Sequence, residues 1–133
     1  MRLFAVISIA FVLNACAEPL YSNIDNTELQ TLIAQGVPLY DIRRAEEWRQ
    51  TGVVAGSRAL TFVDAGGRVN PDFMPGFTRD VRADQPVILI CHSGNRSAVL
   101  ARELTEKLGY KQVYNVRVGI AGWLDDARPM VAY

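Results

Sequence analysis

The chain contains few of the residues that metal sites and nucleic-acid surfaces require. Its 133 residues include one histidine and two cysteines, and no carboxylates cluster at metal-ligand spacing. A structural zinc site is therefore excluded, and we expect neither a metal nor a cofactor. Basic and acidic residues balance at 14 each, which argues against a nucleic-acid partner. The Gly-Lys-Ser/Thr ending of a phosphate-binding P-loop is also missing, which argues against nucleotide hydrolysis.

The only long apolar run lies at the N-terminus, where Arg2 precedes an apolar stretch from Leu3 to Leu13 and small residues follow. This order predicts a secretory signal peptide over residues 1–17. The run is shorter than the ~20 residues that a membrane-spanning helix needs. We therefore expect an exported, periplasmic protein.

Two ways of processing this segment stay open. Ala15-Cys16-Ala17 fits cleavage before Glu18, whereas residues 13–16 resemble a bacterial lipobox, with Asn14 an unusual residue in it. Attachment to a membrane is expected only if Cys16 is lipidated. In both cases Cys91 is the only unmodified cysteine of the mature domain, residues 20–133, so no disulfide can form within the fold. An unpaired thiol in an oxidising compartment needs an explanation.

Short apolar segments alternate with helical patterns along this single domain. The pattern predicts strands at 37–43, 57–62, 85–91 and 112–116, and helices at 25–36, 45–52, from 72, at 97–109 and from 119. The segment 85–91 is continuously apolar, as expected for the central strand of a parallel sheet covered on both faces. The fold class is therefore α/β, with Trp48 and Trp123 as core anchors. No apolar patch demands a partner, and we expect a monomer.

Cys91 ends the predicted central strand, at the edge where open α/β sheets bind ligands. A polar loop separates it from the next helix. Gly94 tolerates a positive φ, so the loop can curl its N–H groups toward one centre and form an anion cradle. The candidate site consists of Cys91 with His92, Ser93, Gly94, Asn95, Arg96 and Ser97. We expect His92 to contribute its backbone N–H more than its ring, and Ser97 to cap the helix.

The cradle matters because an ordinary cysteine, with a pKa of about 8.5, is only ~3% thiolate at pH 7. Lowering such a pKa to ~6.5 requires roughly 2.7 kcal/mol of preference for the charged form. A helix dipole supplies only ~0.3–1 kcal/mol. Several converging amides and a cation such as Arg96 are therefore needed, and this loop contains both. The pattern favours a nucleophilic Cys91 over a cysteine that only fills the core.

The loop "CHSGNRS" resembles the active-site loop of single-domain rhodanese-like sulfurtransferases. "YDIRRAEEW" is similar to the family's D-x-R strand end with the helix that follows it, and "YNVRVGIAGW" is similar to its Gly-Gly-x-x-x-Trp segment. The chain departs from the family pattern at Val53 and Ala55, where His and Pro are usual, and at Val118, which replaces the first Gly of the pair.

This resemblance implies a three-layer sandwich around a mostly parallel five-stranded sheet. It implies that Cys91 takes a sulfane sulfur from thiosulfate or a persulfide donor and passes it, as a persulfide, to a thiol or cyanide acceptor. The other loop residues would bind the substrate. Asp41, Arg43 and Glu47 would be structural residues near the site, with Glu47 as the partner of Arg43.

Two other functions stay open. A cysteine-dependent phosphatase or arsenate reductase is less favoured, because only four residues separate Cys91 from Arg96 where phosphatase loops have five, and no Asp lies close by as an evident general acid. A non-catalytic sulfur-binding or regulatory module of the same fold is the second alternative.

Overall fold

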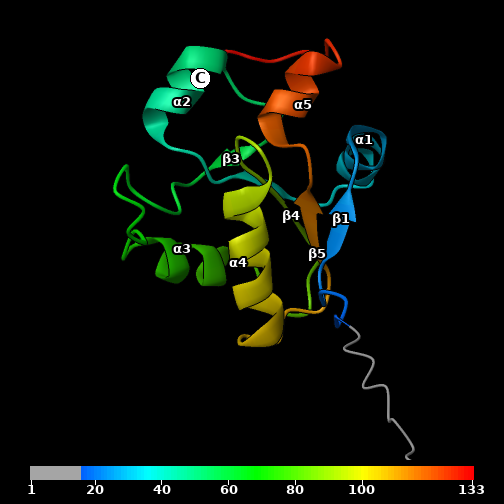
Figure 1. Ribbon diagram of the computed structural model, residues 1–133, viewed down its shortest axis with the longest axis vertical. Coiled ribbons are helices and arrows are strands. Elements are labelled where there is room, and N and C mark those ends of the chain that lie inside the picture. The colour runs from blue at the N-terminus through cyan, green and yellow to red at the C-terminus, as the bar shows by residue number, and fades with distance from the viewer. Residues whose placement is uncertain (1–15) are drawn as a thin grey trace, which may run out of the picture.

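A computed structural model describes residues 16–133, in which five strands form one parallel sheet of order β1-β5-β4-β2-β3 (Figure 1). This confirms the α/β class and the five-stranded sheet. The strands are β1 (Ser22–Ile24), β2 (Leu39–Asp41), β3 (Arg58–Ala59), β4 (Val87–Ile90) and β5 (Val113–Val116). The helices are α1 (Asn26–Ala34), α2 (Ala45–Thr51), α3 (Phe73–Asp80), α4 (Asn95–Glu106) and α5 (Gly119–Asp125).

Strand β4 is the central strand, as its unbroken apolar sequence predicted. All four of its residues are fully buried, because helices cover both faces of the sheet. Helices α3 and α4 pack on one face, and α1 and α5 pack on the other (Figure 1). Helix α2 lies beyond the carboxyl ends of the strands, next to the start of α4.

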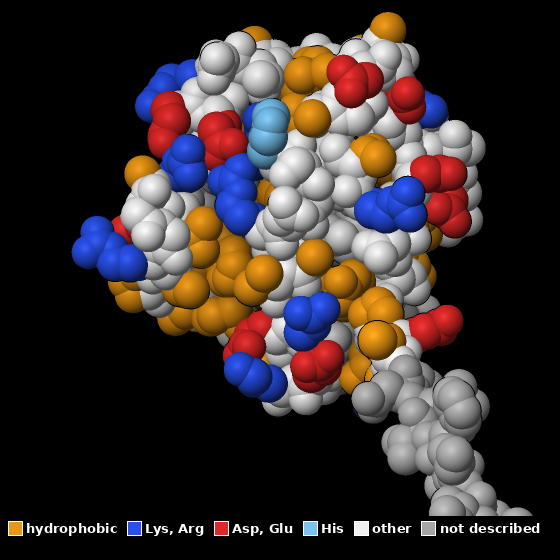
Figure 2. Space-filling view, viewed as in Figure 1, with side chains coloured by type: hydrophobic (Ala, Val, Ile, Leu, Met, Phe, Trp, Pro, Cys, Tyr) orange, Lys and Arg blue, Asp and Glu red, His pale blue; other side chains and the backbone are white. Residues whose placement is uncertain are grey.

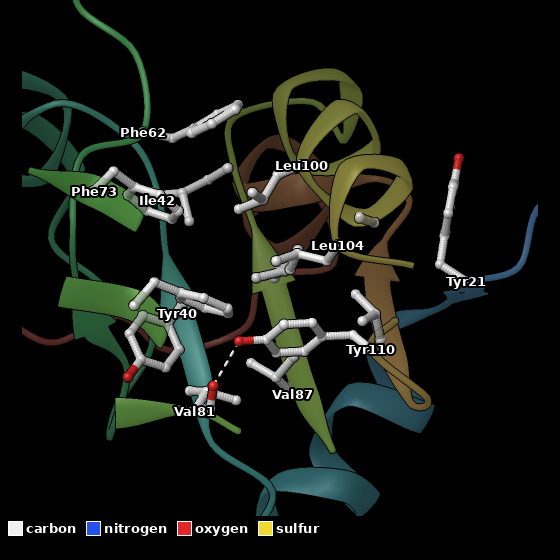
Figure 3. Close-up of a cluster of buried hydrophobic side chains, with 14 of the residues drawn as sticks. Tyr21, Tyr40, Ile42, Phe62, Phe73, Val81, Val87, Leu100, Leu104 and Tyr110 are labelled. Carbon is white, nitrogen blue, oxygen red and sulfur yellow. Dashed lines mark hydrogen bonds between the residues drawn. The ribbon is translucent and has the colours of Figure 1, made fainter. Parts of the chain in front are cut away.

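The larger core lies between the sheet and helices α3 and α4 (Figure 3). Aromatic rings fill much of it, and Phe77 packs edge-on against Tyr40 with 5.0 Å between ring centroids. The hydroxyl of Tyr110 donates a hydrogen bond of 2.6 Å to the carbonyl of Val81, drawn as the dashed line in Figure 3. Burial raises the pKa of Tyr110, and this bond satisfies a hydroxyl that the core would otherwise isolate.

Helix α1 starts at Asn26, inside the predicted range 25–36, with Asp25 as its N-cap and Glu28 completing a capping box. Helix α4 starts earlier than predicted. Gly94 is its N-cap, with φ +88°, and the Gly94 carbonyl accepts the first helical hydrogen bond, from the N–H of Ala98. The prediction that Ser97 caps this helix is therefore wrong, because the glycine makes the turn three residues sooner.

Strand β1 was not predicted. It has three residues, of which only Ile24 is buried, and it pairs with β5 at the edge of the sheet. So short and polar a segment carries no alternation that a sequence pattern could reveal.

Both tryptophans are buried, as predicted. The C-terminal residues run back over α2, where Val131 pairs with Val53 and the ring of Tyr133 lies 4.9 Å from that of Trp48. The backbone of Val53 thus holds the C-terminal segment against the domain, through two hydrogen bonds of 2.9 Å that do not involve its side chain.

The predicted signal peptide lies outside the described residues except for Cys16 and Ala17, and Cys16 is exposed. Between residues 16 and 133, no helix combines the length and apolar character that crossing a membrane requires.

Candidate active site

Cys91 follows β4 directly, and its side chain is buried beneath the loop that leads into α4, with 1% of the residue exposed. Three groups contact its sulfur. The N–H of Gly94 donates to Sγ at 3.2 Å, the N–H of Ser97 donates at 3.4 Å, and the hydroxyl of Ser97 lies 3.2 Å from it. Hydrogen bonds from these donors favour a negative charge on the sulfur.

Two residues of the predicted loop donate to the sulfur, Gly94 and Ser97. His92, Ser93 and Asn95 are exposed at the rim, and their part in binding a substrate stays a prediction. Ser97 is fully buried at the third position of α4. It thus acts on the cysteine instead of capping the helix.

Two glycines let the loop pack closely against the segment between β5 and α5. A Cβ at Gly94 would clash with the carbonyl of Arg117, and a Cβ at Gly119 would clash with the carbonyl of His92. Both glycines have positive φ, +88° and +59°. The N–H of Ile120 then donates to the Cys91 carbonyl at 2.9 Å, which fixes the loop on the start of α5.

Val118 stands where the family usually has glycine, and it takes an ordinary φ of −91°. Since no positive φ is needed there, a valine is accepted at this position. The glycine that this turn does require is Gly119.

Arg96 forms a bidentate ion pair with Glu47 of α2, with N···O distances of 2.8 and 2.7 Å. Glu47 also accepts the backbone N–H of Arg44 at 3.0 Å. Burial by itself would raise the pKa of Glu47, but the hydrogen bonds and charges of Arg96 and Arg44 outweigh it and lower that pKa to about 2. The same pairing raises the pKa of Arg96. Acidic and basic side chains accordingly lie intermixed over α2 and the start of α4 (Figure 2).

The predicted pair between Arg43 and Glu47 is therefore wrong. Arg43 pairs with Asp41 instead, at 2.8 Å, and both side chains are fully buried. Asp41 also accepts the indole N–H of Trp48 at 3.0 Å, and Arg43 donates to the carbonyl of Gly52 at 2.9 Å. This buried network ties the end of β2 to the middle and the C-terminal end of α2, and so it positions the helix that carries Glu47.

The sequence analysis did not single out Asn115 on β5. Its side-chain amide lies 3.4 Å from the carbonyl of Gly94, beneath the active-site loop, and it is 2% exposed. The available signal was an asparagine at a position where strand alternation calls for an apolar side chain.

The described part of the chain holds no group of three or more His, Cys, Asp or Glu side chains that could bind a metal ion.

Comparison with known proteins identifies one family. The model of the rhodanese-like domain matches residues 25–126. Thiosulfate sulfurtransferase GlpE of Tolumonas auensis is 38% identical over 52 residues, which cover 39% of this chain and 48% of that protein. This chain therefore spans about half the length of that relative. Thiosulfate sulfurtransferase 18 of Arabidopsis thaliana is 25% identical over 112 residues, covering 81% of this chain and 82% of the relative.

Solved structures show the same fold. A rhodanese-related protein from Thermoplasma volcanium superimposes with a TM-score of 0.64 at 25% identity, covering 85% of this chain and all of that one. The polysulfide-sulfur transferase of Wolinella succinogenes, a homodimer, gives a TM-score of 0.66 at 18% identity, covering 86% of this chain and 80% of that one. At that identity, the second match concerns the fold alone.

Proposed function

The chain belongs to the rhodanese-like domain family, and we propose that it is a sulfurtransferase that carries a sulfane sulfur as a persulfide on Cys91. The observation that carries the proposal is the set of donors around Sγ. Two backbone N–H groups and one hydroxyl surround a single sulfur at 3.2–3.4 Å. Such a set stabilises a thiolate, which is the attacking species in sulfur transfer.

In the first step, the Cys91 thiolate attacks the outer sulfur of thiosulfate. A Cys91–S bond forms, the S–S bond of thiosulfate breaks, and sulfite leaves with the bonding electron pair. Cys91 then carries a persulfide anion. In the second step a thiolate or cyanide attacks the terminal sulfur, which leaves as an organic persulfide or thiocyanate, and the Cys91 thiolate is restored. No external oxidant or reductant is consumed.

The donors of Gly94 and Ser97 stabilise the negative sulfur of Cys91 before and after this cycle. Glu47 binds both terminal nitrogens of Arg96 and so fixes the guanidinium at the start of α4, while its carboxylate offsets part of the positive charge. His92, Ser93 and Asn95 are exposed at the rim of the loop, where a small donor would first meet the protein.

The same ion pair disfavours the phosphatase alternative. In a phosphatase the loop arginine would have to bind the phosphate, and here Glu47 already accepts from both terminal nitrogens of Arg96 and offsets its positive charge. Sulfur transfer needs no such clamp on a tetrahedral anion.

The test is mass spectrometry of a Cys16→Ser protein, in which Cys91 is the only thiol. After incubation with thiosulfate we expect an adduct of about 32 Da, one sulfur atom, that dithiothreitol removes. The matched control Cys16→Ser/Cys91→Ser should show no adduct. A folded protein that gains no sulfur from thiosulfate, polysulfide or a persulfide donor would refute the proposal. The non-catalytic module would then be the better description of the function.

We also propose that the protein is exported, on the strength of residues 1–17. The mass of the mature N-terminus tests this: a chain that starts at Glu18 or at a lipidated Cys16 supports export, and an unprocessed Met1 contradicts it.

A further inference from the structure

Asn115 is a polar residue in an apolar layer. Along β5, Val113 belongs to the core on the α4 side, whereas Tyr114 and Val116 belong to the core on the other side. Strand alternation therefore places Asn115 on the α4 face, opposite Leu89 of β4 and Asn23 of β1 in register. It is 2% exposed, and its Oδ1 has no hydrogen-bond partner among residues 16–133. An apolar side chain of similar size would stabilise this layer better.

The amide of Asn115 faces two acceptors. Its Nδ2 donates to Oδ1 of Asn23 at 2.9 Å and to the carbonyl of Gly94 at 3.4 Å. The opposite orientation of the amide would bring Oδ1 of Asn115 against the Gly94 carbonyl oxygen, a pairing of two acceptors. The Gly94 carbonyl thus determines which way this side chain points.

Gly94 is the residue that most needs an external support. It has no Cβ and a φ of +88°, so its own backbone does little to fix its orientation. Its N–H is one of the two backbone donors to the Cys91 sulfur. Its carbonyl is held by the N–H of Ala98 at 3.1 Å and by Asn115. The carbonyl and the N–H of Gly94 belong to successive peptide units that share its Cα. Loss of the second bond lets this Cα shift, and the N–H then moves away from the sulfur.

We propose that Asn115 is a positioning residue for the reaction: it holds the Gly94 carbonyl so that the Gly94 N–H points at the Cys91 sulfur. The inference rests on the proposed function, in which Cys91 is the nucleophile. It explains why this layer keeps a buried amide with an unpartnered oxygen.

The experiment measures alkylation of Cys91 by iodoacetamide in the Cys16→Ser protein, which requires no sulfur donor. In Asn115→Leu the volume is kept and the donor is lost. At neutral pH we expect the rate constant for alkylation to fall about threefold to tenfold, because the loss of one hydrogen bond to the thiolate lowers the thiolate fraction by about this factor. At about pH 10, where an ordinary thiol is fully ionised, the rate should be unchanged. A residue that only fills space would alter neither rate.

Asn26 supplies a matched control. It is also buried, at 4% exposure, and its Oδ1 also lacks a partner within the described part of the chain. Its Nδ2 donates to the Gly122 carbonyl and to Asp126 on the other side of the sheet. Asn26→Leu should leave alkylation at the native rate. If Asn115→Leu does not fold, Asn115→Ala gives the same comparison.

If a folded Asn115→Leu protein is alkylated at neutral pH with the rate constant of the native protein, the inference is overturned. A different result would contradict the proposed function: the native protein would be alkylated at Cys91 but would accept no sulfur from any donor. The two failures can therefore be told apart.

Discussion

The ion pair between Glu47 and Arg96 makes the stability of the protein depend on pH in a direction that can be worked out. Two short charge-assisted hydrogen bonds join the side chains, which are 18% and 23% exposed. The pKa of Glu47 falls from 4.5 to about 2. At about 1.4 kcal/mol for each unit of pKa, the folded state gains about 3 kcal/mol at neutral pH from the ionised Glu47.

The sign follows from the depressed pKa. Because the folded protein binds the Glu47 proton more weakly than the unfolded chain does, this stability is fully present above pH 4.5 and is lost as the pH falls toward about 2. Between pH 7 and pH 3 the native protein should lose about 2 kcal/mol through this group alone. Glu47→Gln cannot titrate, so the variant should lack this part of the pH dependence.

The assay is urea unfolding of the native and Glu47→Gln proteins at a series of pH values. We expect the native protein to be the more stable of the two at pH 7, and the difference to shrink by about 2 kcal/mol at pH 3. Glu103→Gln is the control, because it removes an exposed pair with Lys107 and should change stability by less than about 1 kcal/mol at any pH. Parallel native and Glu47→Gln curves would refute the assignment of the Arg96 pair.

Three further variants test other parts of the structure. Asp41→Asn leaves the buried charge of Arg43 without its balancing carboxylate, and urea unfolding should show a loss of about 3–5 kcal/mol. Gly94→Ala places a Cβ at a φ of +88° against a carbonyl; we expect it to cost about 1–3 kcal/mol and to slow alkylation of the thiol, and native values of both would contradict the loop geometry. Tyr110→Phe removes the donor to the buried Val81 carbonyl and should cost about 1–2 kcal/mol, whereas an unchanged midpoint of unfolding would show that this bond adds nothing.

The sequence predicted the central elements of the fold because their burial imposes a pattern. Strand β4 is buried on both faces and is therefore apolar at every position. Strand β1 is buried only at Ile24 and has no such pattern. The start of α4 was misplaced for a related reason, since a glycine N-cap is marked by backbone geometry and gives no side-chain signal like that of Asp25.

The ion pairs of the site could not be read from sequence spacing. Arg43 and Glu47 are four residues apart, the spacing of a pair on one helical face, but α2 begins at Ala45, so Arg43 is not on the helix. Arg43 turns back to Asp41, and Glu47 faces Arg96, which is 49 residues further along the chain. Such contacts depend on how α2 lies across the sheet, which only the tertiary structure defines.

The active-site loop is too short and too rich in small residues to hold its own shape, and three separate segments hold it. Helix α2 binds Arg96 through Glu47, the start of α5 binds the Cys91 carbonyl, and β5 reaches Gly94 through Asn115. Helix α2 follows β2, and α5 follows β5, which carries Asn115 itself. The strands β2 and β5 are the two neighbours of β4 in the sheet. Because parallel strands end at one edge of the sheet, their supports converge on the loop from both sides. A change far from Cys91 in sequence therefore acts on the thiol when it moves one of these supports.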